Sequence, residues 1–170
     1  MKLLTGLFLT FLVAAIVSID SSNTLMIGNS GEPATLDPHK YNLRLEETLL
    51  NDLFLGLTTF NADGEIVAGA AESWETSADG LTWRFFLRED LKWSDGKNLT
   101  AEDFVYSFRR LLNPQTAASL SYFLYMIKNA EQVNNAQKAV SSLGVYSDGP
   151  NILVIELDQP ATPIRAFTLP

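Results

Sequence analysis

Residues 70–114 read AAESWETSADGLTWRFFLREDLKWSDGKNLTAEDFVYSFRRLLNP and contain a hairpin, a second turn and a helix. The Asp-Gly dipeptide at 79–80 separates two aromatic-rich runs, which is a strong hairpin signal. Alternate positions of the second run share one face of the expected strand, and they are Trp83, Phe85 and Leu87. Phe86 interrupts this alternation, so we expect the opposite face to be partly covered as well.

The rest of that stretch predicts a capped helix. Thr100 is placed as an N-cap, and Asp103 follows three residues later where a capping box would have Glu or Gln. Glu102 and Asp103 also favour the positive end of a helix dipole. Five apolar side chains then line one face, namely Phe104, Val105, Phe108, Leu111 and Leu112. Asn113 and Pro114 end the pattern.

Other elements are predicted on both sides of this region. Helical spacing of leucines predicts a helix at 44–55 that ends at Gly56. A second helical region is expected at 117–141, with a break near Asn129. Short apolar runs at 25–28, 143–146 and 152–157 predict strands. The chain is therefore expected to fold as a mixed α and β protein.

The N-terminus predicts a leader segment. Lys2 precedes an apolar run at 3–19, and the polar residues 20–23 follow at once. This pattern is typical of a secretory signal peptide, which we place at 1–22. An uncleaved membrane anchor is the alternative. The chain has no cysteine, which excludes disulfides, thiolate metal sites, a cysteine nucleophile and a lipid-modified cysteine in this sequence.

The composition excludes several functional classes. Apolar residues make up 46% of the 170 residues and the net charge is −8, so neither disorder nor nucleic-acid binding is expected. His39 is the single histidine, and a loop hydrogen bond explains it better than a metal site. Asp95 and Glu102 are better explained by turn formation and helix capping than as a glycosidase pair. We therefore expect no enzyme, no metal and no cofactor.

A set of ordered motifs resembles family 5 of the extracellular solute-binding proteins, the peptide and nickel receptors of ABC importers. The resemblance covers residues 25–160 and is closest to the oligopeptide-binding branch. Its pieces are LDPHK at 36–40, DLFLGL at 52–57, GAAESW at 69–74, WRFFLR at 83–88, KWSDG at 92–96, LTAEDFVYS at 99–107 and NPQTA at 113–117.

The resemblance implies a two-lobed α/β receptor with the type II periplasmic-binding-protein architecture. It implies a periplasmic monomer that binds oligopeptides and delivers them to the permease subunits of an ABC transporter. Residues 23–55 would begin the first lobe and residues 56–170 would form its accessory subdomain, both as part of a longer receptor. A different cargo (a nickel chelate, haem or an oligosaccharide) and a fragment without independent function are the alternatives.

The resemblance also implies candidate ligand residues. The loop after the LDPHK motif contacts the ligand backbone in this family, and here it supplies Asn42, Leu43 and Arg44. The oligopeptide branch often has an acidic residue where this chain has Asn42, and Asn42 would serve equally as a helix N-cap. Where the family has a groove aromatic, this chain has Leu120, with Tyr122 two residues on as the groove candidate. Core packing is the alternative for Tyr122. The three tryptophans, Trp74, Trp83 and Trp93, are expected in the subdomain core.

Overall fold

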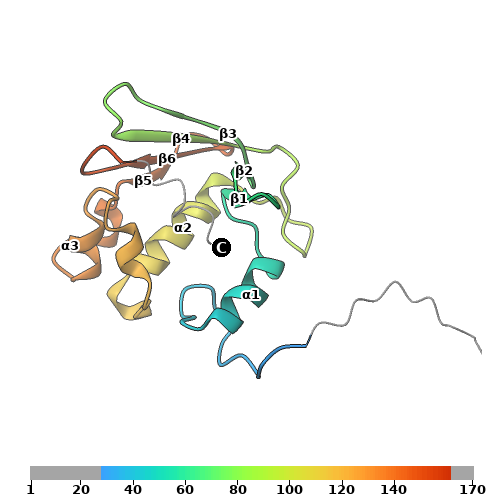
Figure 1. The fold of residues 1–170 in the computed structure, drawn as a ribbon. Helices are drawn as coiled ribbons and strands as arrows, with labels where there is room; N and C mark the ends of the chain where they lie inside the picture. Colours follow the sequence, from blue (N-terminus) through green and yellow to red (C-terminus); the bar gives the residue numbers. More distant parts are fainter. Residues whose placement is uncertain (1–27, 162–170) are drawn as a thin grey trace, which may run out of the picture.

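The computed structural model describes residues 28–161, so the predicted leader (1–22) and most of the strand predicted at 25–28 lie outside the described residues. Figure 1 shows a twisted sheet with helices on one side. The helices are α1 (Arg44–Leu53), α2 (Ala101–Leu112) and α3 (Ala130–Asn134). The strands are β1 (Thr58–Phe60), β2 (Ile66–Ala68), β3 (Ala71–Thr76), β4 (Thr82–Leu87), β5 (Val145–Ser147) and β6 (Ile152–Glu156).

Four strands form the main sheet, in the order β3-β4-β6-β5, and each neighbouring pair is antiparallel. The predicted hairpin joins β3 to β4, and Gly80 adopts a φ of 73° in its turn, a conformation that glycine reaches without strain. Trp83, Phe85 and Leu87 are all buried, as the alternation predicts. Phe86 on the other face is half-buried, which confirms that this face is partly covered too.

Helix α2 packs across the inner face of the sheet, over β5 and β6. Its predicted start is confirmed: the Asp103 carboxylate accepts the Thr100 backbone N–H at 2.8 Å. Val105 and Leu112 are buried, while Phe104, Phe108 and Leu111 pack against the same core at partial exposure. The helix and the sheet therefore share one apolar core, at about 1.5–3 kcal/mol for each fully buried large side chain before entropy is subtracted.

Helix α1 ends two residues earlier than predicted, and Gly56 is not its cap. Phe54 is already extended, and its N–H closes the last helical turn on the Leu50 carbonyl. The chain then runs beside residues 69–71, where the Gly56 carbonyl accepts the N–H of Ala70 at 2.9 Å. This extended pairing is incompatible with helix, so the helix has to stop before it.

The helical region predicted at 117–141 is wrong for most of its length. Only α3 is helical there, with short 3-10 turns at Ser121–Leu124 and Val140–Ser142. Ala117, Asn129 and Ala136 have φ values of 53°, 65° and 58°, and left-handed residues interrupt a right-handed helix. The predicted break near Asn129 is thus confirmed, whereas those at Ala117 and Ala136 were not predicted. Asn134 organises this region instead, because its side chain accepts from Ser121 and Tyr125 and donates to the Leu112 carbonyl.

The predicted core positions of the aromatic residues are confirmed only in part. Trp83 is buried and Trp74 packs against the core at partial exposure. Trp93 is 42% exposed, because it lies in the tight 92–98 turn beyond the sheet. Tyr122 is 55% exposed, so its alternative assignment to the core is wrong. Between residues 28 and 161, no helix has the length and apolar character that crossing a membrane requires.

Candidate functional site

The loop at residues 34–43 precedes α1 and is folded around one buried carboxylate. Glu46 is 1% exposed, although it lies in the first turn of a surface helix. Its two oxygens accept four backbone N–H groups at 3.0–3.3 Å, from Ala34, Thr35, Asn42 and Leu43. These donors lower the pKa of the Glu46 carboxyl, the Asn42 N–H most of all. Glu46 therefore fastens both ends of the loop to α1.

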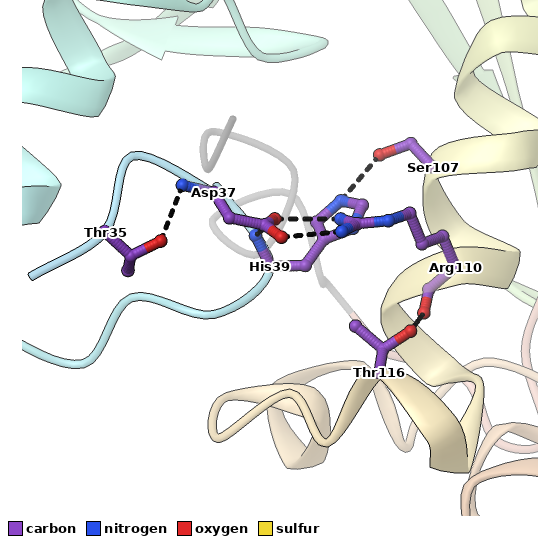
Figure 2. Close-up of polar contacts among 6 residues, drawn as sticks. All are labelled: Thr35, Asp37, His39, Ser107, Arg110 and Thr116. Atoms are coloured by element: carbon purple, nitrogen blue, oxygen red, sulfur yellow. Dashed lines mark hydrogen bonds and ion pairs between the residues drawn. The ribbon is translucent and has the colours of Figure 1, made fainter.

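A second polar cluster joins the same loop to α2, and Figure 2 shows it. Arg110 donates two hydrogen bonds to the Asp37 carboxylate, at 2.8 and 2.6 Å, and approaches His39 Nδ1 at 2.7 Å. His39 Nε2 lies 3.0 Å from the Ser107 hydroxyl. The Arg110 carbonyl accepts a hydrogen bond from the Thr116 hydroxyl. We call Asp37, His39, Ser107 and Arg110 the clasp.

The charges of the clasp follow from its geometry. A guanidinium N–H can only donate, so His39 Nδ1 accepts from Arg110 and the ring proton sits on Nε2, facing Ser107. Burial, and then the charge of Arg110, lower the pKa of His39 to about 4. The hydrogen bonds from Arg110 hold the pKa of Asp37 well below its usual range. At neutral pH the clasp thus contains one ion pair and one neutral imidazole, so His39 is the loop hydrogen-bonder that the sequence predicts.

The predicted ligand residues of the loop are exposed. Asn42 and Arg44 lie at the surface, and the Leu43 side chain is 53% exposed. Leu43 is the N-cap of α1, so the alternative N-cap role for Asn42 is wrong by one residue. Glu46 already takes the N–H groups of Asn42 and Leu43. Asn42 can therefore offer a ligand its side-chain amide but not its backbone N–H.

A small apolar pocket of about 90 Å³ lies between the loop, α2 and residues 118–124. It is lined by His39 and Tyr41 from the loop, Leu55 after α1, Phe108 from α2 and Phe123 from the later turn, among others. Tyr122 does not line it, but its ring contacts that of Phe123, with centroids 4.4 Å apart and the ring planes tilted by 31°. The structure thus brings the two predicted regions to neighbouring surfaces. Tyr41 and Phe123 share the pocket, whereas Asn42, Leu43, Arg44 and Tyr122 lie outside it.

The described part of the chain offers no set of three or more His, Asp or Glu side chains that could hold a metal ion. The exposed loop and the aromatic pair suit non-covalent binding, through an amide group and apolar rings.

Sequence reasoning did not find Glu46 or Arg110. Glu46 occupies the third helical position, where a capping-box glutamate belongs, and that position is the signal that could have identified it. The partners of Arg110 lie 71 and 73 residues away, and no local pattern reports such a pairing.

Comparison with known proteins gives concordant results. Residues 65–170 match the model of bacterial extracellular solute-binding proteins, family 5. The periplasmic oligopeptide-binding protein OppA of Haemophilus influenzae is 39% identical over 144 residues, which are 84% of this chain and 27% of that protein. The probable deoxycholate-binding periplasmic protein YgiS of Escherichia coli is 37% identical over 134 residues, covering 78% of this chain and 25% of YgiS.

The fold agrees with solved structures. The complex of Haemophilus influenzae OppA with the peptide RPPGFSPFR superposes with a TM-score of 0.78 at 37% identity, over 81% of this chain and 27% of that one. This confirms the predicted fold class, a mixed α and β segment of a type II periplasmic-binding-protein-like architecture. The chain spans about a quarter of the length of the curated relatives it matches.

These relatives are named as binding proteins, not as enzymes. The matched region includes the hairpin, α2 and the whole main sheet. The chain belongs to family 5 of the bacterial extracellular solute-binding proteins.

Proposed function

We propose that this chain serves the capture of oligopeptides in the periplasm for an ABC importer. The observation that carries the proposal is the superposition on a peptide complex over 81% of the chain at 37% identity. The exposed Asn42 amide and the Tyr122–Phe123 pair would face the ligand. A peptide presents both backbone amides and apolar side chains, and these two surfaces complement them.

The proposed layout follows the family. Residues 1–22 are a signal peptide, residues 23–55 begin the first lobe, and residues 56–170 form its accessory subdomain. The sparse contacts between α1 and the other described helices and strands support a boundary near residue 55. The receptor would act as a monomer and deliver its peptide to the permease subunits of the importer.

One relative points to a second class of ligand. YgiS is named as a probable deoxycholate-binding protein, and it is nearly as similar to this chain as the peptide receptors are. A bile acid is an apolar steroid with a carboxylate, and the exposed Leu43 side chain next to the exposed Arg44 offers an apolar group and a cation. The choice of peptide rests on the superposition on a peptide complex, and the relatives named as peptide-binding proteins support it.

A chimaera tests the proposal. Residues 28–161 replace the matching segment of Haemophilus influenzae OppA, and the product is titrated with RPPGFSPFR by calorimetry. We expect saturable binding of one peptide, and no measurable binding to the 170-residue chain alone, because closure of two lobes is what buries the peptide.

The unmodified Haemophilus influenzae protein serves as the reference, and a cooperative thermal melt establishes that the chimaera folds. If the folded chimaera binds deoxycholate but no peptide, deoxycholate replaces the peptide as the proposed ligand. A folded chimaera that binds neither ligand would remove the proposal altogether.

A further inference from the structure

Residues 34–53, which we call the N-terminal unit, are joined to one another by one set of polar contacts and to α2 by another. Glu46 fastens the loop to α1 through four hydrogen bonds. Helix α1 makes only sparse contacts with the other described helices and strands, and Figure 1 shows it apart from the sheet. The unit meets α2 through the clasp and through the pocket that Pro38, His39 and Tyr41 line.

The clasp requires an uncharged His39. Arg110 Nη1 lies 2.7 Å from His39 Nδ1, so the hydrogen bond exists only while Nδ1 keeps its lone pair. Protonation would place an imidazolium N–H against a guanidinium N–H. The attraction becomes a repulsion between two positive charges, at a side chain that is 7% exposed.

We propose that the Asp37–Arg110 ion pair and neutral His39 hold the N-terminal unit on α2, and that protonation of His39 releases the unit. The ion pair cannot compensate for the lost Arg110–His39 hydrogen bond. Arg110 Nη1 and Nη2 both donate to the Asp37 carboxylate already, so no further bond between the two side chains forms there. The Glu46 contacts join the loop to α1 and not to α2, so the unit leaves α2 without coming apart at the loop.

The groups around His39 leave it as the titrating member. Asp37 on the loop stays ionised, because Arg110 on α2 holds its pKa far down. Tyr41 on the loop stays neutral, because burial and then Glu47 raise its pKa. Residues 55–57 and 118–124 line the same pocket without an ionisable side chain there. Between pH 7 and pH 4 the His39 imidazole is therefore the one group of the clasp whose charge changes.

The consequence for binding rests on the proposed function. The unit carries Asn42 and Leu43, so Asp37, His39 and Arg110 act as positioning residues for the ligand loop. Release of the unit lowers peptide affinity at acid pH. The docked unit holds His39 at a pKa of about 4, and the released unit returns it to about 6.5. As the pH falls between these two values, the docking equilibrium constant decreases by up to about tenfold per pH unit, which makes it on the order of a hundredfold lower at pH 4.5 than at pH 7.

Hydrogen exchange of the full chain tests the release without any ligand, so this inference and the proposed function can fail separately. An undocked helix of ten residues is marginal in water, so release exposes the α1 amides to exchange. We expect α1 protection factors, corrected for chemical exchange rates, to fall about a hundredfold from pH 7 to pH 4.5. The β4 and β6 amides open only by global unfolding, so they should remain more strongly protected than the α1 amides at both pH values.

The matched control is His39→Gln, which keeps a neutral acceptor and donor and should show no such fall. An unchanged α1 at pH 4.5, or an equal fall in His39→Gln, contradicts the proposal. If the His39→Gln variant does not dock, a second measurement on the unmodified chain replaces it. That measurement is an NMR titration of the single histidine. A midpoint well below 6.5 that coincides with the loss of α1 protection supports the clasp, and a midpoint at 6.5 or above overturns it.

Discussion

The N-terminal unit (residues 34–53) and the sheet with α2 (residues 58–157, the body) are stabilised by different physics. The body has an apolar core in which Phe85, Val105 and Leu153 are almost fully buried. The unit buries the apolar side chains Tyr41 and Leu50 as well, but it also keeps a carboxylate and an imidazole buried, Glu46 and His39. Apolar burial is nearly indifferent to pH, whereas buried ionisable groups are not.

The two regions also differ in where the candidate ligand residues lie. Candidate ligand residues Asn42 and Leu43 lie on the polar-held unit, whose position depends on a few directional contacts. The family-defining hairpin and α2 lie in the body, and their buried side chains serve packing. Each prediction below perturbs one of the two regions and asks whether the other responds.

Phe85→Ala should have the largest effect, because it removes a fully buried ring from the centre of the sheet. We expect a loss of about 3–5 kcal/mol in the free energy of unfolding, measured by urea denaturation. Phe86→Ala, on the half-buried opposite face, is the matched control and should lose clearly less. Equal losses would mean that the body has no single packed face.

Acid pH should come next, through His39. Its folded pKa of about 4 is below its unfolded value, so its contribution is complete above pH 6.5 and is lost as pH falls toward 4. The loss is up to about 3 kcal/mol, measured as the change in unfolding free energy between pH 7 and pH 4. His39→Gln should remove this part of the pH dependence, since the chain has no other histidine. If the unfolding free energy of His39→Gln depends on pH in the same way as that of the unmodified chain, His39 does not contribute to the loss of stability in acid.

Glu46→Gln should loosen the unit and leave the body unchanged. An amide offers one acceptor where the carboxylate offers two, and its NH₂ group would face backbone donors. We expect the Ala34, Thr35, Asn42 and Leu43 amides to exchange at least about tenfold faster. Glu47→Gln is the control, because Glu46 and not Glu47 accepts these bonds. Faster exchange throughout β4 would show that the two regions are one cooperative block.

The Asp37–Arg110 pair should give the smallest effect. Its side chains are 25% and 32% exposed, so the usual strength of a charged hydrogen-bonded pair is reduced to about 1 kcal/mol. A double-mutant cycle with Asp37→Asn and Arg110→Met measures this coupling. The more exposed Arg84–Asp148 pair in the body is the comparison and should couple less. A larger coupling there would reverse the contrast between the regions.

The same contrast explains what could be predicted from sequence. The hairpin at 79–80, the alternation of β4 and the Thr100–Asp103 cap depend on neighbouring residues, and all three are confirmed. The helix at 117–141 is wrong for most of its length because, besides the predicted break at Asn129, the left-handed residues Ala117 and Ala136 interrupt it, and neither is a glycine. The core position predicted for Trp93 is wrong because the residue type alone does not show whether an aromatic residue lies in a strand or in an exposed turn.

The sequence points to the candidate ligand residues, whose role stays a prediction, but not to the contacts that hold them. The family motif located Asn42, Leu43 and Arg44, and the structure places them on an exposed loop and helix start. The contacts that hold this loop were not predictable, because Arg110 and Asp37 are 73 residues apart. A distant pair of opposite charges is common in any sequence, and only the fold shows which pairs meet.

The most direct test of the two-region account is native-state hydrogen exchange at pH 7 with increasing, sub-denaturing urea. We predict that the α1 amides exchange through a local opening that responds weakly to urea, while the β4 and β6 amides exchange through global unfolding with a steep urea dependence. Exchange of α1, β4 and β6 with one common opening free energy and one common urea dependence would contradict the account.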